Sequence, residues 1–272
     1  MLYKIFWFIV IICSCFTACK DETKSTQPEV NYTIIGPAGE LDWRFDHEFS
    51  DEFNGSSLDA GKWWPYNPEW KGREPGYFNP NNVSVDSGYL NIVMKHEDLD
   101  NLPDGYHTYT CGAVQSKNTV LYGYFEVRIR AMDSRGSSSF WFYNAQPDWW
   151  TEIDVFELGA GVPGKENVVN MNVHVFRTPT DGDNHWQKFE EWEAPFNLAE
   201  DFHVYGLEWD AAAIKFYIEG ELVRTVQNTH WHQPLTINFD SETMPDWFGL
   251  PEIETLPSTY RIDYIRVWKK LE

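Results

Sequence analysis

Three acidic side chains lie close together in an apolar, aromatic stretch of the chain. Glu152, Asp154 and Glu157 follow Trp149 and Trp150, and the residues between the acids are apolar. Crowded carboxyl groups that are partly withdrawn from water repel one another, which raises the pKa of at least one of them. Glycoside hydrolysis needs this asymmetry, because one carboxylate acts as the nucleophile while another stays protonated as the general acid.

The spacing of these acids predicts an irregular strand. Residues two apart on a strand share a face, so Glu152 and Asp154 point the same way. Glu157 would point to the opposite face unless one β-bulge near residues 155–156 restores it. The two glutamates then lie roughly 5–6 Å apart, the separation of retaining enzymes. Two alternatives are a solvated acidic strand and a site for a hard cation, with His174 as a further ligand.

The alternation of side chains predicts an all-β fold. Apolar and polar residues alternate along 123–132, 214–219 and 260–268, and Glu219-Gly220 is typical of a hairpin turn. These patterns favour a sandwich of two antiparallel sheets. Aromatic residues make up 17% of the chain, which suits both a sandwich core and a groove for sugar rings.

The segment 152–157, Glu-Ile-Asp-Val-Phe-Glu, resembles the bulged signature of glycoside hydrolase family 16, Glu-x-Asp-x-x-Glu. The resemblance covers about residues 41–270. It implies a β-jelly roll with a concave substrate cleft, and a retaining endo-glycosidase that forms a glycosyl-enzyme intermediate. Further segments that resemble the family are 51–55, 85–90, 123–128, 138–141, 204–210 and 263–268.

The resemblance implies a role for each residue of the motif. Glu152 is expected to be the nucleophile and Glu157 the acid/base, and Asp154 is expected to hold the geometry and charge of the nucleophile. Trp141 is expected to stack on a sugar near the cleavage point. His174 is expected on the neighbouring strand, facing the cleft.

The loop at 64–78 resembles the agarase and carrageenase branches of the family, and it contains Trp70 and Arg73. Arg73 and Arg177 are expected to bind sulfate or galactose hydroxyls, since a guanidinium group matches oxyanions. Trp150 and Glu242 complete the expected sugar contacts. The predicted substrate is an algal galactan of the agar, porphyran or carrageenan type. The alternatives are a β-1,3-glucan and a non-catalytic role in glycan binding at the cell surface.

No cofactor is expected for the chemistry. Some members of the family hold a structural calcium ion on the convex face, and the resemblance implies Gly88 and Asp263 as its ligands here.

The N-terminus predicts export and lipidation. Residues 1–18 have an apolar core too short to span a bilayer comfortably, which is typical of a signal peptide. The peptide ends in Phe16-Thr17-Ala18-Cys19, which resembles a lipobox and makes Cys19 the lipidated residue. Residues 19–37 are polar and form the predicted tether, and 38–272 form the predicted catalytic domain.

We expect a lipoprotein of the bacterial outer membrane, exposed at the cell surface. An ordinary signal peptide with an incidental cysteine is the alternative.

The composition limits the partners. A net charge of −21 and a pI of about 4.6 disfavour nucleic acid and anionic lipid surfaces. Nucleic acid is therefore not an expected partner. As the resemblance implies, we expect the chain to bind a polysaccharide. We also expect a monomer that meets the membrane only through its anchor.

Overall fold

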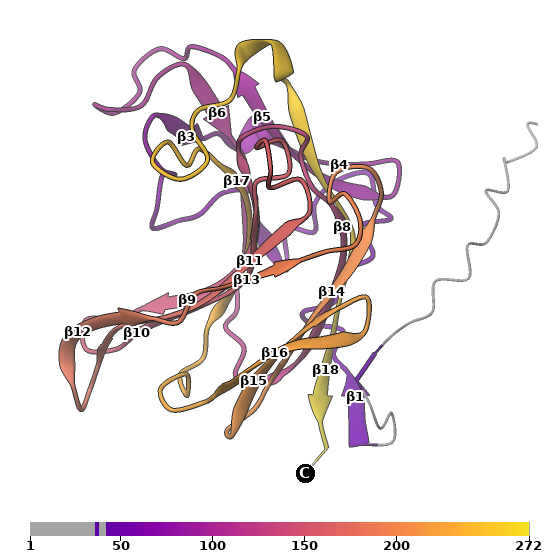
Figure 1. Ribbon diagram of the computed structural model, residues 1–272, viewed down its shortest axis with the longest axis vertical. Helices are drawn as coiled ribbons and strands as arrows, with labels where there is room; N and C mark the ends of the chain where they lie inside the picture. The colour runs from indigo at the N-terminus through magenta and orange to yellow at the C-terminus, as the bar shows by residue number, and fades with distance from the viewer. Residues whose placement is uncertain (1–35, 38–41, 272) are drawn as a thin grey trace, which may run out of the picture. The chain divides into compact units, whose positions relative to one another are not determined.

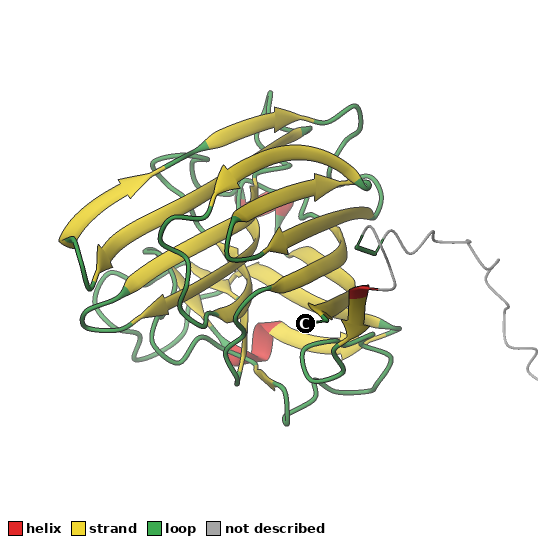
Figure 2. Ribbon diagram, turned by 90° about the horizontal axis from the view of Figure 1, so that it is seen from below, coloured by secondary structure: helices red, strands yellow, loops and turns green. Residues whose placement is uncertain are grey.

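The computed structural model describes residues 36–37 and 42–271, which belong to one compact unit, Ile35–Glu272. The predicted leader, Cys19 and most of the predicted tether lie outside the described residues. Short 3-10 helices accompany the strands in the described part, among them η2 (Pro80–Asn82) and η3 (Ile253–Thr255) (Figure 2). Within 36–37 and 42–271, no helix is long and apolar enough to cross a membrane.

Ten strands of the described chain form the first sheet (Figure 1). Their order is β16-β15-β14-β8-β18-β5-β6-β3, with β1 beside β18 and β4 beside β5. Neighbours are antiparallel except β3 and β6, which run parallel. The strands are β1 (Trp43–Phe45), β3 (Gly76–Phe78), β4 (Val83–Asp86), β5 (Tyr89–His96), β6 (Tyr109–Cys111), β8 (Gly123–Arg130), β14 (His203–Trp209), β15 (Ala213–Ile218), β16 (Glu221–Gln227) and β18 (Ser258–Lys270).

Eight described strands form the second sheet, in the order β12-β11-β10-β9-β17-β7-β2, with β13 beside β11. Two sheets built almost entirely from antiparallel pairs confirm the predicted sandwich. The strands are β2 (Trp63–Trp64), β7 (Ala113–Ser116), β9 (Ser137–Ala145), β10 (Trp150–Leu158), β11 (Val168–Thr178), β12 (Gly182–Gln187), β13 (Glu190–Glu193) and β17 (Thr236–Glu242).

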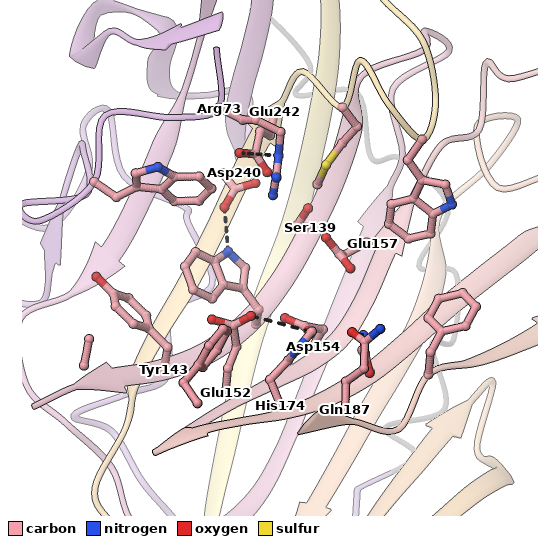
Figure 3. A pocket seen from close by; sticks show the side chains of 18 of the residues that line it. Arg73, Ser139, Tyr143, Glu152, Asp154, Glu157, His174, Gln187, Asp240 and Glu242 are labelled. Carbon is pink, nitrogen blue, oxygen red and sulfur yellow. Dashed lines mark hydrogen bonds and ion pairs between the residues drawn. The ribbon is translucent and has the colours of Figure 1, made fainter. Parts of the chain in front are cut away.

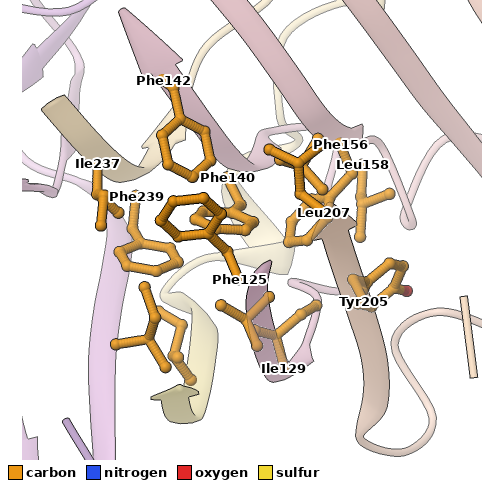
Figure 4. Close-up of a cluster of buried hydrophobic side chains, with 14 of the residues drawn as sticks. Phe125, Ile129, Phe140, Phe142, Phe156, Leu158, Tyr205, Leu207, Ile237 and Phe239 are labelled. Atoms are coloured by element: carbon orange, nitrogen blue, oxygen red, sulfur yellow. The ribbon is translucent and has the colours of Figure 1, made fainter. Parts of the chain in front are cut away.

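The facing sides of the two sheets form one hydrophobic core, rich in aromatic rings (Figure 4). Phe125 of β8 contacts Phe142 of β9, with ring centroids 4.8 Å apart. Phe156 of β10 contacts Tyr205 of β14 at 4.6 Å. These edge-to-face and tilted contacts join the first sheet to the second, so the core fixes β9 and β10 on the face that points toward the first sheet.

The predicted hairpin at Glu219-Gly220 is confirmed. It joins β15 to β16, and both turn residues have positive φ, 49° and 78°. This is the backbone of a type I′ turn, whose twist matches that of the two strands it connects.

Strand β8 differs from its predicted half-buried pattern, because its polar face is buried too. Glu126 is 0% exposed and Arg128 is 7% exposed. The carboxylate of Glu126 accepts hydrogen bonds from the Tyr264 hydroxyl at 2.9 Å and from the Gly36 N–H at 2.8 Å. Gly36 belongs to the predicted tether, so that segment has one residue bound to a central strand.

Candidate active site

A β-bulge in β10 brings the three acids onto one face. Asp154 pairs with Trp141 of β9, and the next pair is Phe156 with Phe140, so Val155 has no partner on that strand. Val155 and Phe156 are consecutive and both belong to the core. Glu152, Asp154 and Glu157 all line a cavity of about 750 Å³ on the other side of the strand. The predicted bulge is confirmed, and its cause is visible in this packing.

The cavity brings together most of the predicted site residues (Figure 3). It lies over the face of the second sheet that points away from the core, and loops before β3 and after β17 form part of its wall. The predicted residues that line it are Trp70, Arg73, Trp141, Trp150, Glu152, Asp154, Glu157, His174 and Glu242.

Arg177 has a different place from the other predicted sugar contacts, because it lies outside the cavity lining. Its guanidinium lies over the ring of Trp150, 5.4 Å from the centroid. It also forms an ion pair with Asp183 at 3.3 Å and donates a hydrogen bond to the carbonyl of Pro147 at 3.0 Å. Arg177 therefore contacts a lining residue without lining the cavity itself.

The electrostatics of the cluster favour a shared proton. Burial raises the pKa of Glu152 and of Glu157 well above the ordinary value, and the neighbouring charge of Asp154 raises both further. The positive charge of Arg73 acts in the opposite direction on both. Because each ionised group disfavours ionisation of the next, the cluster keeps a proton at a pH where isolated carboxyl groups have lost theirs.

His174 faces the cluster from β11, as predicted. It is paired with Glu152 in the register of the two strands. Its Nε2 atom lies 3.2 Å from Asp154 Oδ2 and 3.9 Å from Glu152 Oε1. On the core side, the buried indole N–H of Trp231 donates to the backbone carbonyls of Glu152 and His174, at 2.8 and 3.2 Å. One side chain thus holds both strands at the point where the acids meet the histidine.

Asp240 is a site residue that the sequence analysis missed. It is 2% exposed, lines the cavity, and accepts a hydrogen bond from Trp141 Nε1 at 2.5 Å. Burial raises its pKa to about 7. The sequence spacing could have identified Asp240, because it precedes Glu242 by two residues and so lies on the same face of the strand. Glu242 itself is buried and forms an ion pair with Arg73 Nε at 3.3 Å.

Two exposed aromatic residues were also missed. Phe189 and Trp247 line the cavity and contact each other, with ring centroids 5.8 Å apart. They come from loops more than fifty residues apart in the sequence. Neither loop has a periodic pattern, so only the tertiary structure brings the two rings together.

The residues predicted to bind calcium fit the ion poorly. Asp263 Oδ2 accepts a hydrogen bond from Arg128 Nη1 at 2.7 Å. This carboxylate therefore already has a cationic partner, and calcium prefers several oxygen ligands without a competing positive charge. Gly88 has a φ of 81° in the turn between β4 and β5. The calcium site stays a prediction.

Comparisons with a family model, with known sequences and with solved structures all give matches to porphyranases. The family model described as "Beta-porphyranase A-D, GH16 domain" matches residues 43–270. β-Porphyranase E of Zobellia galactanivorans is 34% identical over 253 residues, which cover 84% of this chain and 88% of that protein. β-Porphyranase B of Phocaeicola plebeius is 31% identical, with 84% of each covered. The crystal structure of porphyranase B from Zobellia galactanivorans superposes with a TM-score of 0.75 at 25% identity, covering 85% of this chain and 94% of that one.

The raised pKa of Asp240 makes a prediction about stability. The pKa of Asp in an unfolded chain is about 3.9, whereas burial raises the pKa of Asp240 to about 7 in the fold. Its contribution to stability is therefore complete below the unfolded value and is lost as the pH rises through about 7. Asp240→Asn keeps an acceptor for Trp141 but cannot ionise. At pH 8.5 we expect it to raise the free energy of unfolding by up to a few kcal/mol, since one pKa unit corresponds to about 1.4 kcal/mol.

The measurement is urea unfolding of parent and variant at pH 5 and pH 8.5. The gain should be clearly smaller at pH 5, and the exposed Asp104→Asn should show no such pH dependence. A variant that is less stable than the parent at pH 8.5 would contradict the assignment.

Proposed function

The chain belongs to glycoside hydrolase family 16, and from that membership we propose that it hydrolyses porphyran, or a closely related sulfated algal galactan, at internal β-linkages with retention of configuration. The structural observation that carries the proposal is the bulge at Val155, which presents Glu152 and Glu157 to one cavity. The matching family model and two relatives at least 30% identical are those of β-porphyranases, which supports porphyran over the other galactans.

The proposed reaction uses the two glutamates in two steps. Glu157, protonated, donates its proton to the glycosidic oxygen while the carboxylate of Glu152 attacks the anomeric carbon, so that the aglycone leaves as an alcohol. Water then attacks the anomeric carbon of the glycosyl-enzyme ester while Glu157 removes a proton from that water, and the bond to Glu152 breaks to release its carboxylate. Burial and the neighbouring charge of Asp154 raise the pKa of Glu157, which suits a group that must hold a proton in the first step. These carboxyl groups supply the chemistry without a cofactor.

The charges of the cavity suggest how a sulfated polymer binds. Among the described lining residues, Arg73 has the one permanently positive side chain, against several carboxyl groups. Half of the Arg73 side chain is exposed, although its Nε contacts Glu242. A sulfate group would therefore bind at Arg73, and the remaining sugars that enter the cavity would be uncharged. Trp70 and Trp141 offer ring faces for them, with centroids 6.1 Å apart in an edge-to-face arrangement.

We also propose that the enzyme acts as a monomer attached through lipidated Cys19 to the outer membrane, facing outward. The apolar leader that ends at Ala18 supports this location.

Substitution of either glutamate tests the mechanism. Glu152→Ser should abolish turnover without loss of folding or glycan binding, since no nucleophile remains. Glu157→Gln should lower kcat on polysaccharide on the order of 10²–10⁴-fold, because the leaving sugar lacks a proton donor. Reducing-end release measures both, with the exposed Glu221→Gln as the control. More than a few per cent of residual activity in Glu152→Ser would refute its role.

Arg73 tests the choice of polymer. The assay compares porphyran, agarose, κ-carrageenan, furcellaran, laminarin and lichenan. We expect porphyran to be cleaved fastest, and Arg73→Gln to lower kcat/KM on sulfated polymers by roughly 10–100-fold, the size expected for a lost hydrogen bond to a charged group. Arg44→Gln, at an exposed position on β1 of the first sheet and outside the lining, is the control and should change little. Activity on laminarin or lichenan alone would move the substrate to the glucans.

Cys19 tests the location. In a bacterial host that processes lipoproteins, the chain should incorporate labelled palmitate and sediment with membranes. Cys19→Ala should abolish the label. A parent chain that is secreted without the label would favour the ordinary signal peptide.

A further inference from the structure

We infer that Glu152, Asp154 and His174 form a binding site for Zn²⁺ within the cleft, and that zinc bound there excludes the polysaccharide. Each residue offers one ligand atom, and the three atoms lie within 4.8 Å of one another. Glu157 is not needed for this site. The inference concerns a ligand other than the substrate and does not depend on which polymer is cleaved.

The separations of the ligand atoms suit a tetrahedral ion. Zinc binds imidazole nitrogen and carboxylate oxygen at about 2.0–2.2 Å, so neighbouring ligand atoms of a tetrahedron lie about 3.3–3.5 Å apart. His174 Nε2 lies 3.2 Å from Asp154 Oδ2 and 3.9 Å from Glu152 Oε1. Small rotations of the two carboxylates therefore suffice to place all three atoms around one ion.

Asp154 gives an independent indication of a ligand. Its side chain is only 6% exposed, and its Oδ2 atom is buried without a hydrogen-bond partner among the described residues. The nearby His174 Nε2 is close enough for a hydrogen bond but is not aligned for one. Buried carboxylate oxygens normally have a partner, because withdrawing them from water is costly. A cation between the two atoms would satisfy both.

The second ring nitrogen of His174 is also held. His174 Nδ1 lies 3.4 Å from His185 Nε2 on the neighbouring strand β12. The rings of His174 and His185 are both nearly parallel to that of Phe176, with interplanar angles of 12° and 7°. Histidine ligands of metals commonly donate their second N–H to a neighbouring group, which fixes the ring and strengthens the bond. His185 is placed to accept that hydrogen bond.

The type of ligand selects the metal. Calcium and magnesium take oxygen ligands, six or more for calcium. One imidazole nitrogen with two carboxylates suits zinc, and three protein ligands leave the fourth position to water. Because Glu152 is both a ligand and the predicted nucleophile, zinc and the sugar require the same carboxylate. Zinc is therefore expected to inhibit competitively.

The experiment is calorimetric titration of the purified full-length chain with ZnCl₂ in a chelator-free buffer at pH 7. We expect one bound ion per chain. His174→Gln and Asp154→Asn should abolish binding, and His185→Gln should weaken it by about 10–100-fold. The matched control is His203→Gln, because His203 lies beside a single carboxylate, that of Glu219 at 2.9 Å, in the other sheet. This control should bind zinc like the parent, and melting curves verify that each variant is folded.

A second measurement follows galactan hydrolysis at increasing zinc concentrations. The apparent KM should rise while kcat stays constant, and EDTA should restore the parent KM. Absence of zinc binding, or binding that survives His174→Gln in a folded protein, overturns the site. A chain that binds zinc as expected but cleaves no polymer would refute the proposed function and leave the metal site standing.

Discussion

A regular β-strand cannot present both Glu152 and Glu157 to the same cavity, because side chains five positions apart point to opposite faces. The unpaired residue Val155 removes this constraint. It does so without loss of core packing, because Val155 and Phe156 are both buried between the sheets. The packing of Phe156 against Tyr205 of the opposite sheet then holds the bulged backbone in place. The geometry of catalysis thus depends on a contact on the far side of the strand.

The same arrangement accounts for the unusual electrostatics of the cleft. Among the described lining residues, seven carboxyl groups, including Asp240 and Glu242 from β17, share one cavity with one arginine. Burial raises the pKa of Glu152, Glu157, Asp240 and Glu242. Such crowding destabilises the folded state, and it persists because the strands that bear the acids are fixed by the core. The cleft therefore holds protons more strongly than isolated carboxyl groups do.

Supporting groups surround the acids on both sides. Trp231 joins β10 to β11 from the core, while Asp240 fixes the Trp141 ring from within the cleft. His174 links these parts, because it contacts the acids through one ring nitrogen and His185 through the other. The resulting cluster of carboxylates and imidazole suits both the hydrolysis of a glycosidic bond and the binding of a zinc ion.

Local sequence determined the strands, the hairpin at Glu219-Gly220 and the catalytic bulge, because each follows from the alternation of side chains over a few residues. The acids were found from their type and spacing, whereas Trp141 and His174 were found through the resemblance to the family. Tertiary structure alone decided the burial of Glu126, the position of Arg177 outside the cavity and the contact between Phe189 and Trp247. These features depend on segments far apart in the chain, whose meeting leaves no periodic signal in either segment.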